Sequence, residues 1–211
     1  MDAAEAADTI TETAEERRHE ASENFRSRGA VVIAVIAAVL AVCELGGENA
    51  KNAMIDFNIK ASDAWNFYQA KNQRQTAYKL AADGLKRELS NPALPAAAKP
   101  AIQADYEKYQ KTVVRYDDEP DASAPNDPTK GEGKKQLSAR AKSYEEAREK
   151  AADRNDSFDF GQMLLQLAIV LGSVSILTSS HALLRVCMGL GVLGAALVAN
   201  GFWLHIPLPF G

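Results

Sequence analysis

Two neighbouring stretches decide the fold: residues 161–178, GQMLLQLAIVLGSVSILT, and residues 182–204, ALLRVCMGLGVLGAALVANGFWL. The first stretch carries no charged residue, and the second carries only Arg185. Each is close to the roughly 20 apolar residues that a helix needs to cross a bilayer. Arg185 lies near the short polar segment between them, from which a long side chain can reach the lipid headgroups. We therefore expect a hairpin of membrane-spanning helices at 161–179 and 182–204.

A third apolar run lies near the other end of the chain. Residues 29–43 read GAVVIAVIAAVLAVC, and with residues 45–47 the run approaches the same length. A signal peptide is one alternative, but the mostly polar residues 1–28 precede the run. A buried core helix is another. The apolar hairpin at the far end favours insertion, so we expect a membrane-spanning helix at 29–47, preceded by an acidic tail at 1–28.

Charge is segregated along the sequence. The 211 residues contain 24 Lys and Arg against 28 Asp and Glu, which gives a net charge of −4 and no basic footprint for nucleic acid. Only Glu44, Asp159 and Arg185 carry charge within residues 29–47 and 158–211. The two cysteines both lie in apolar runs, which excludes a disulfide scaffold. This pattern excludes an ordinary soluble globule and is typical of a membrane protein with a polar middle.

The polar middle carries a heptad pattern, with spacings that alternate between four and three residues as in a coiled coil. The first heptad series is Ala50, Met54, Phe57, Ala61, Ala64, Tyr68, Lys71, Gln75, Tyr78, Ala82, Leu85 and Leu89. The second series is Ile102, Tyr106, Tyr109, Val113 and Tyr116. Because Asn91-Pro92 separates them, we expect an antiparallel helical hairpin at 48–116.

The first heptad register extends backward into the N-terminal apolar run. The first span and the following helix can therefore form one rod, with Gly46-Gly47 as the favoured place for a kink. Residues 117–133, DDEPDASAPNDPTKGEG, predict a flexible linker because they hold almost nothing apolar. A helix at 134–160 then leads into the membrane. The predicted fold class is all-α: an integral membrane protein with three transmembrane helices and a helical, coiled-coil-like extramembrane domain.

Four residues of the middle region are candidates for partner contact: Trp65, Tyr68, Lys71 and Gln75. Aromatic rings beside cationic side chains are typical of binding surfaces. The alternative is a heptad face with aromatic flanks, which needs no partner.

Three polar residues lie in or beside the predicted spans: Glu44, Gln162 and Gln166. An ionisable or amide side chain in such a setting can mark a polar path. The alternatives are a headgroup position for Glu44 and helix-to-helix hydrogen bonds for the two glutamines. Small residues at every fourth position favour close helix packing at two places. These are Ala30, Ala34 and Ala38 in the first span and Gly191, Ala195 and Ala199 in the third.

Motifs for chemistry are scarce. His19, His181 and His205 occur at no spacing typical of metal ligands. The sequence contains no phosphate-binding glycine motif and no nucleophile elbow. We therefore expect no enzyme activity, no cofactor and no metal.

One segment of the sequence resembles a known family. KASDAWNFYQAKNQRQ at 60–75, which follows the apolar run and its ending ELGGENAKNA, resembles a bacterial membrane family, domain of unknown function 4337. The likeness covers most of residues 29–204. It implies a small inner-membrane protein with about three spans, and it supplies no activity and no catalytic residues.

The expected function is that of a membrane-anchored interaction protein. Its partners would be the lipid bilayer and either further copies of itself or a larger membrane complex. The alternative is an oligomeric channel or transporter component lined by the polar residues of the spans. The short arginine-bearing segments favour a cytoplasmic N-terminus in a bacterial inner membrane, with residues 48–157 periplasmic.

Overall fold

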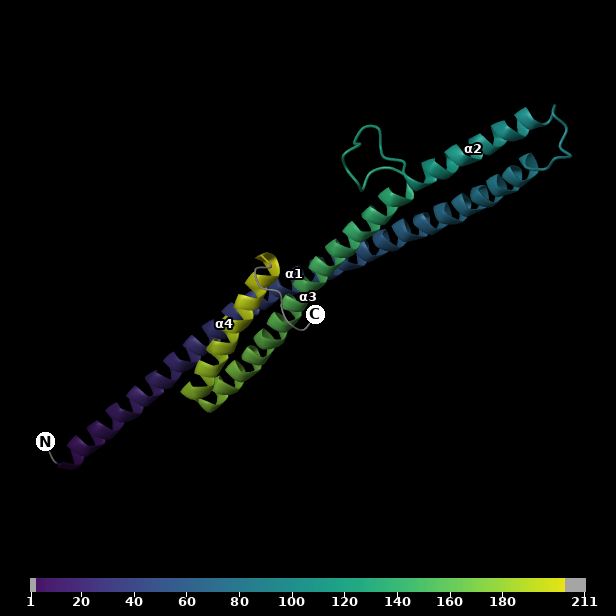
Figure 1. The fold of residues 1–211 in the computed structure, drawn as a ribbon. Coiled ribbons are helices and arrows are strands. Elements are labelled where there is room, and N and C mark those ends of the chain that lie inside the picture. Colours follow the sequence, from purple (N-terminus) through teal and green to yellow (C-terminus); the bar gives the residue numbers. More distant parts are fainter. Residues whose placement is uncertain (1–2, 204–211) are drawn as a thin grey trace. The chain divides into compact units, whose positions relative to one another are not determined.

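The described residues are almost wholly helical. The computed structural model describes residues 3–203, with side chains from residue 17 onward. Its helices are α1 at Ala3–Leu89, α2 at Lys99–Asp117, α3 at Lys134–Thr178 and α4 at His181–Trp203 (Figure 1). Helix accounts for 86% of the described residues, and these residues contain no strand. The predicted all-α class is confirmed.

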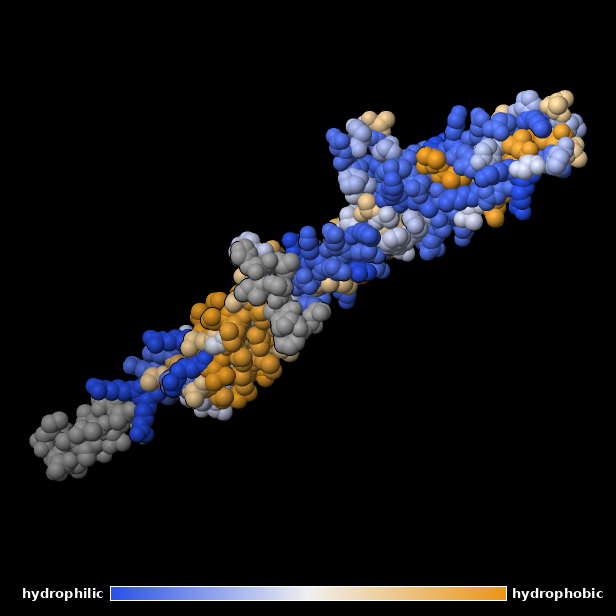
Figure 2. Space-filling model, in the orientation of Figure 1, coloured by the Kyte–Doolittle hydropathy of each residue, from blue (hydrophilic) through white to orange (hydrophobic). Residues whose placement is uncertain are grey.

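The chain forms two compact units. The apolar unit contains Met1–Asn52 and Ala151–Gly211, and the polar unit contains Ala53–Lys150. Helices α1 and α3 contribute to both units because they are 87 and 45 residues long. In Figure 2 the hydrophobic surface gathers on the apolar unit, and hydrophilic residues dominate the polar unit.

Three helices, α1, α3 and α4, are long and apolar enough to cross a membrane. Only 22–28% of the most apolar window of each helix is buried inside the protein. Large apolar side chains therefore face outward, as at Val35 (58% exposed), Val170 (60%) and Val192 (69%). A helix that is apolar on its outer face suits a lipid environment better than water.

Close packing in the apolar unit depends on small residues of α4. The buried face of this helix consists of Cys187, Gly191, Gly194, Val198 and Gly201. A Cβ atom at Gly194 would lie 2.8 Å from the side chain of Leu165, which is closer than real contacts allow. The absent side chains therefore let the helix backbones approach each other.

The small residues predicted for packing divide into two groups. Gly191 is buried, and Ala195 and Ala199 are half-buried. The three alanines of the first span, Ala30, Ala34 and Ala38, are exposed. The α4 spacing therefore packs within the chain, whereas the α1 spacing does not.

Gly46 and Gly47 were the favoured place for a kink, but the structure gives another reason for glycine at these positions. Helix α1 continues through both residues. A Cβ atom at Gly46 would lie 2.5 Å from the ring of Phe158, and one at Gly201 would lie 2.9 Å from the same ring. Phe158 is only 3% exposed and packs edge-to-face on Phe202 at 5.1 Å. The glycines make room for this ring.

The first heptad series forms the packing face of α1 in the polar unit. Its members from Met54 to Leu89 are all buried or half-buried. Phe57 stacks on Tyr144 of α3 at 6.5 Å, whereas Tyr78 meets Tyr109 of α2 at 5.4 Å. The same face thus packs first on α3 and then on α2, which runs antiparallel to α1.

The segments predicted to lie outside the main helices agree with the structure only in part. Residues 3–28, predicted as an acidic tail, belong to α1. The predicted linker forms a loop at 118–133 with an isolated bridge between Pro120 and Gly131, and Gly131 has a φ of +120°. The flexibility of this loop stays a prediction. Leu204, the predicted end of the third span, lies outside the described residues.

Candidate functional site

Phe67 is a large aromatic side chain on the surface of the polar unit, with 66% of it exposed. It belongs to α1 and lies outside the heptad series, and neither α2 nor α3 covers it. An exposed aromatic ring in an otherwise polar region is an informative exception to the usual burial of such groups.

Two hollows lie beside this ring. One, of about 350 Å³, is lined by Phe67 together with Lys60, Asp63, Leu137 and Tyr144, among others. The second, of about 270 Å³, is lined by Phe67 with Asn66, Ala70, Lys71 and Arg74. Glu132 of the loop lines both. We call the residues lining the two hollows the Phe67 surface.

Charged groups form the rim of the Phe67 surface. Lys60 Nζ donates a hydrogen bond to Asp56 at 2.6 Å, which raises the pKa of the Lys60 ammonium. Arg140 donates to the carbonyl oxygens of Thr129 and Gly131 at 2.8 and 2.7 Å. An aromatic centre with a charged and polar rim is the usual composition of a protein-binding surface.

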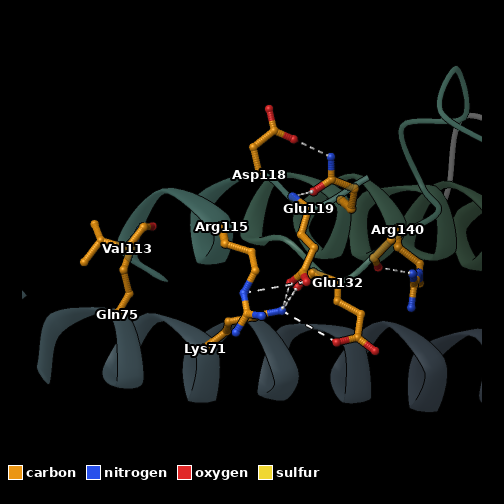
Figure 3. A network of polar contacts seen from close by, with 10 residues as sticks. Lys71, Gln75, Val113, Arg115, Asp118, Glu119, Glu132 and Arg140 are labelled. Atoms are coloured by element: carbon orange, nitrogen blue, oxygen red, sulfur yellow. Dashed lines mark hydrogen bonds and ion pairs between the residues drawn. The ribbon is translucent and has the colours of Figure 1, made fainter. Parts of the chain in front are cut away.

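Lys71 lies at the edge of this surface, in a network of polar contacts (Figure 3). Its side chain is 11% exposed, and its Nζ donates to Glu119 Oε2 at 2.9 Å and to the backbone oxygen of Glu132. Arg115 Nε lies 3.8 Å from the other Glu119 oxygen, and Lys71 Nζ lies 5.2 Å from the ring centroid of Tyr116. A mostly buried ammonium requires such partners, because burial without them is costly.

The start of α3 holds the loop from its other side. Gln136 Oε1 accepts a hydrogen bond from the backbone N–H of Glu119 at 3.2 Å, and its amide nitrogen donates to Asp118 at 2.7 Å. Lys135 donates to the second oxygen of Asp118 at 2.9 Å. The hydrogen bonds from Gln136 and Lys135 lower the pKa of the Asp118 carboxyl. The loop that carries Glu132 is thus anchored to α1, α2 and α3.

Trp65 and Tyr68 lie together in the structure. Their rings pack edge-to-face at 5.5 Å, and Trp65 Nε1 donates a hydrogen bond to Glu145 of α3 at 2.8 Å. Both residues are half-buried. They contribute to the contact between α1 and α3.

Gln75 occupies a buried position beside α2. It is only 2% exposed, and its amide nitrogen donates to the backbone oxygen of Val113 at 2.7 Å. The four residues predicted for partner contact thus all make contacts inside the polar unit, and their role toward a partner stays a prediction. Sequence reasoning missed Phe67 as a candidate. Its position outside the heptad series was a partial signal, which Trp65 shares although it is half-buried.

Two of the three polar candidates of the spans, Gln162 and Gln166, lie four residues apart on α3, whereas Glu44 lies on α1. Glu44 and Gln166 are exposed, and Gln162 is half-buried. Among the described residues no hydrogen bond joins any two of them. The role of these side chains in a polar path stays a prediction.

Metal ligation has no evident place in the part of the chain that the structure describes. Within it, no group of three or more His, Cys, Asp or Glu residues could hold a metal ion. Cys43 and Cys187 are both free and buried. His205 lies outside the described residues.

The fold defines a class: an all-helical chain with three helices apolar enough to span a membrane. The chain belongs to the family described as Domain of unknown function (DUF4337), which it matches over residues 25–204. This match confirms the family resemblance seen in residues 60–75. No significant match is found among curated proteins or among solved structures.

Proposed function

We propose that the chain is an integral membrane protein whose polar unit binds another protein through the Phe67 surface. The partner is a second copy of the chain or a larger membrane complex. The observation that carries the proposal is the 66% exposed Phe67 ring between two hollows with a charged rim. When a partner buries an aromatic anchor of this kind, truncation of the anchor costs about 2 kcal/mol or more of binding free energy at many interfaces.

The membrane part of the proposal assigns residues 29–47, 161–179 and 182–204 to the bilayer. The outward-facing valines and leucines of α1, α3 and α4 support it, because lipid would cover side chains that the protein leaves exposed. An N-terminus on the cytoplasmic side of a bacterial inner membrane is supported by Arg26 and Arg28 before the first span and by Arg185 in the hairpin. Residues 48–157 would then be periplasmic.

The interaction part of the proposal rests on surfaces left free within the chain. The heptad series is occupied by α2 and α3, so it is not available for a coiled coil between chains in this conformation. Phe67 remains exposed, and its neighbours Asp63 and Arg74 are exposed as well. A partner that covers this surface would bury an aromatic ring and leave the charges at the rim.

The native mass of the detergent-solubilised full chain tests the proposal. We expect a particle larger than the monomer, or a partner that co-purifies. Phe67→Ser should reduce the particle toward the monomer, because the aromatic anchor is lost. Leu80→Ser is the matched control, since Leu80 is 64% exposed on the same helix but lines neither hollow. A wild-type monomer without a partner, or equal effects of both variants, would contradict the proposal.

A further inference from the structure

A third hollow lies in the apolar unit, between α1 and α4. Its volume is about 350 Å³, and its lining includes Val31, Val35 and Val39 of α1 with Met188, Val192 and Ala195 of α4. The valines of α1 recur at every fourth position, so they follow one face of the helix. The hollow is therefore an elongated apolar groove parallel to the predicted spans.

Helices α1 and α4 line this groove in the same direction. Ile33 of α1 and Cys187 of α4 both adjoin Gly172 of α3, and Ile36 adjoins Gly191. Helices α1 and α4 thus run parallel to each other here. At their common end, the ring of Phe25 lies 4.4 Å from the ring of His181.

Each of the two helices carries an arginine at this common end of the groove. Arg28 lies seven residues before Val35, and Arg185 lies seven residues before Val192, so each shares a face with the groove. At 1.5 Å per residue, Arg28 stands about 12 Å above the Ile36–Gly191 contact, and Arg185 about 9 Å. Both side chains are exposed. Two cations thus lie at nearly the same height at one end of an apolar groove.

We infer that this groove binds an anionic phospholipid. One acyl chain lies along the valines of α1, and the phosphate lies between the guanidinium groups of Arg28 and Arg185. The inference rests on the proposed membrane insertion of the three spans. Charge complementarity distinguishes a lipid from a span of a second copy. The predicted spans carry a single carboxylate, Glu44, at the opposite end of its span, so such a span would leave the arginines unmatched.

Native mass spectrometry of the full chain in detergent tests the inference, with dioleoyl phosphatidylglycerol as the probe. Phosphatidylcholine with the same chains reports the need for net negative charge, and glycerol 3-phosphate reports binding of phosphate alone. We expect tight retention of phosphatidylglycerol, weaker retention of phosphatidylcholine, and no retention of glycerol 3-phosphate.

Two pairs of variants separate the headgroup contact from the groove. Arg28→Gln combined with Arg185→Gln should weaken phosphatidylglycerol binding about 25-fold, at about fivefold for each arginine. Arg26→Gln is the control for the Arg28→Gln part, because it removes one positive charge two residues away on the opposite face of α1. It should leave binding nearly unchanged. Val192→Trp should fill the groove and weaken binding, whereas Leu193→Trp, outside the groove lining, should not.

Alkaline carbonate extraction of membranes that contain the chain separates failure of the lipid site from failure of the proposed membrane insertion. A chain that resists extraction but binds phosphatidylglycerol no better than phosphatidylcholine would overturn the lipid site alone. Equal effects of Arg26→Gln and the double variant would overturn it as well, as would a loss of dimers rather than of lipid in Val192→Trp. A chain released by carbonate would overturn both the lipid site and the proposed membrane insertion.

Discussion

Lys71 and Gln75 interrupt an otherwise apolar or aromatic heptad series at the place where α1 changes its packing partner. Before them α1 packs on α3, and after them it packs on α2. The loop between α2 and α3 reaches α1 at this point and supplies Glu119 and the backbone oxygen of Glu132 to Lys71. Lys71 thus donates to loop oxygens, and Gln75 donates to the Val113 carbonyl of α2. Two apolar side chains would leave these acceptors without those hydrogen bonds.

Removal of the Lys71 ammonium should loosen the loop. In Lys71→Ala, Glu119 loses its shortest ion pair, and we expect destabilisation of about 1–3 kcal/mol, the usual cost of leaving such a partner unpaired. Hydrogen exchange of residues 118–133 should become faster. Lys79→Ala serves as the control because Lys79 is exposed on the same helix. Unchanged exchange in Lys71→Ala would show that the loop is held without this contact.

Acidification should loosen the same loop through its aspartates. Hydrogen bonds from Ser123 lower the pKa of Asp121, and hydrogen bonds from Thr129 lower the pKa of Asp127. A carboxyl whose pKa is lower in the folded state stabilises that state above the ordinary carboxyl range. This contribution is lost as the pH falls below about 4.

Hydrogen exchange of the Ser123 and Thr129 amides, corrected for the intrinsic pH dependence, measures this effect. We expect lower protection at pH 3 than at pH 5. Residues 91–98, the connector between α1 and α2, contain no carboxylate side chain and should not change. A parallel change in both segments would assign the effect to the unit as a whole rather than to these aspartates.

Single residues were predictable to different degrees. The heptad register predicted that Gln75 lies on the packing face, but it could not predict that α2 supplies the Val113 carbonyl. The register alone could not identify Phe67, because Trp65 also lies outside it and yet packs on Tyr68 and donates to Glu145 of α3. The reason for Gly46 could not be found, since Phe158 lies 112 residues further along the chain.

At the scale of elements, glycine positions determine how closely α4 approaches its neighbours. Gly194 faces Leu165 of α3, whereas a Cβ atom at Gly189 would meet nothing within 4 Å. The two glycines lie five residues apart in the same helix and differ only in what they face. They form a matched pair for measuring the close approach of the helices.

Gly194→Leu should destabilise the apolar unit, because the new side chain overlaps Leu165 and must displace it. Overpacking of this kind costs about 1–3 kcal/mol. Gly189→Leu should leave the stability of the unit nearly unchanged. The thermal midpoint of the detergent-solubilised chain measures both. A lower midpoint in Gly189→Leu that matches Gly194→Leu would argue against the packing assigned to α4.

The helices could be predicted from the heptad spacing and from the residues that end a helix. Asn91-Pro92 predicted an end close to Leu89, and Lys134 was the predicted start of α3. The predicted hairpin at 48–116 assigned the heptad face to the second series alone, whereas Phe57 packs on Tyr144 of α3. The short connector after Leu89 places α2 beside the C-terminal part of α1, and the loop at 118–133 then brings α3 to the preceding part.

At the scale of the whole molecule, segregated composition separates the chain into an apolar and a polar unit. Average composition conceals this division, because the charged middle offsets the apolar ends. The exposed apolar side chains of α1, α3 and α4 are the central feature to explain. Water would make such a surface costly, at roughly 25 cal/mol for each Å² exposed, whereas lipid removes that cost.

Labelling of single cysteines with a membrane-impermeant maleimide tests the assignment of these helices to lipid most directly. The background carries Cys43→Ser and Cys187→Ser, and opened membranes expose both faces. Val170 and Leu80 are 60% and 64% exposed within the protein, so only a bilayer distinguishes them. If α3 lies in lipid, Leu80→Cys is labelled and Val170→Cys is protected until detergent is added. Equal labelling of both cysteines in detergent-free membranes would contradict this assignment.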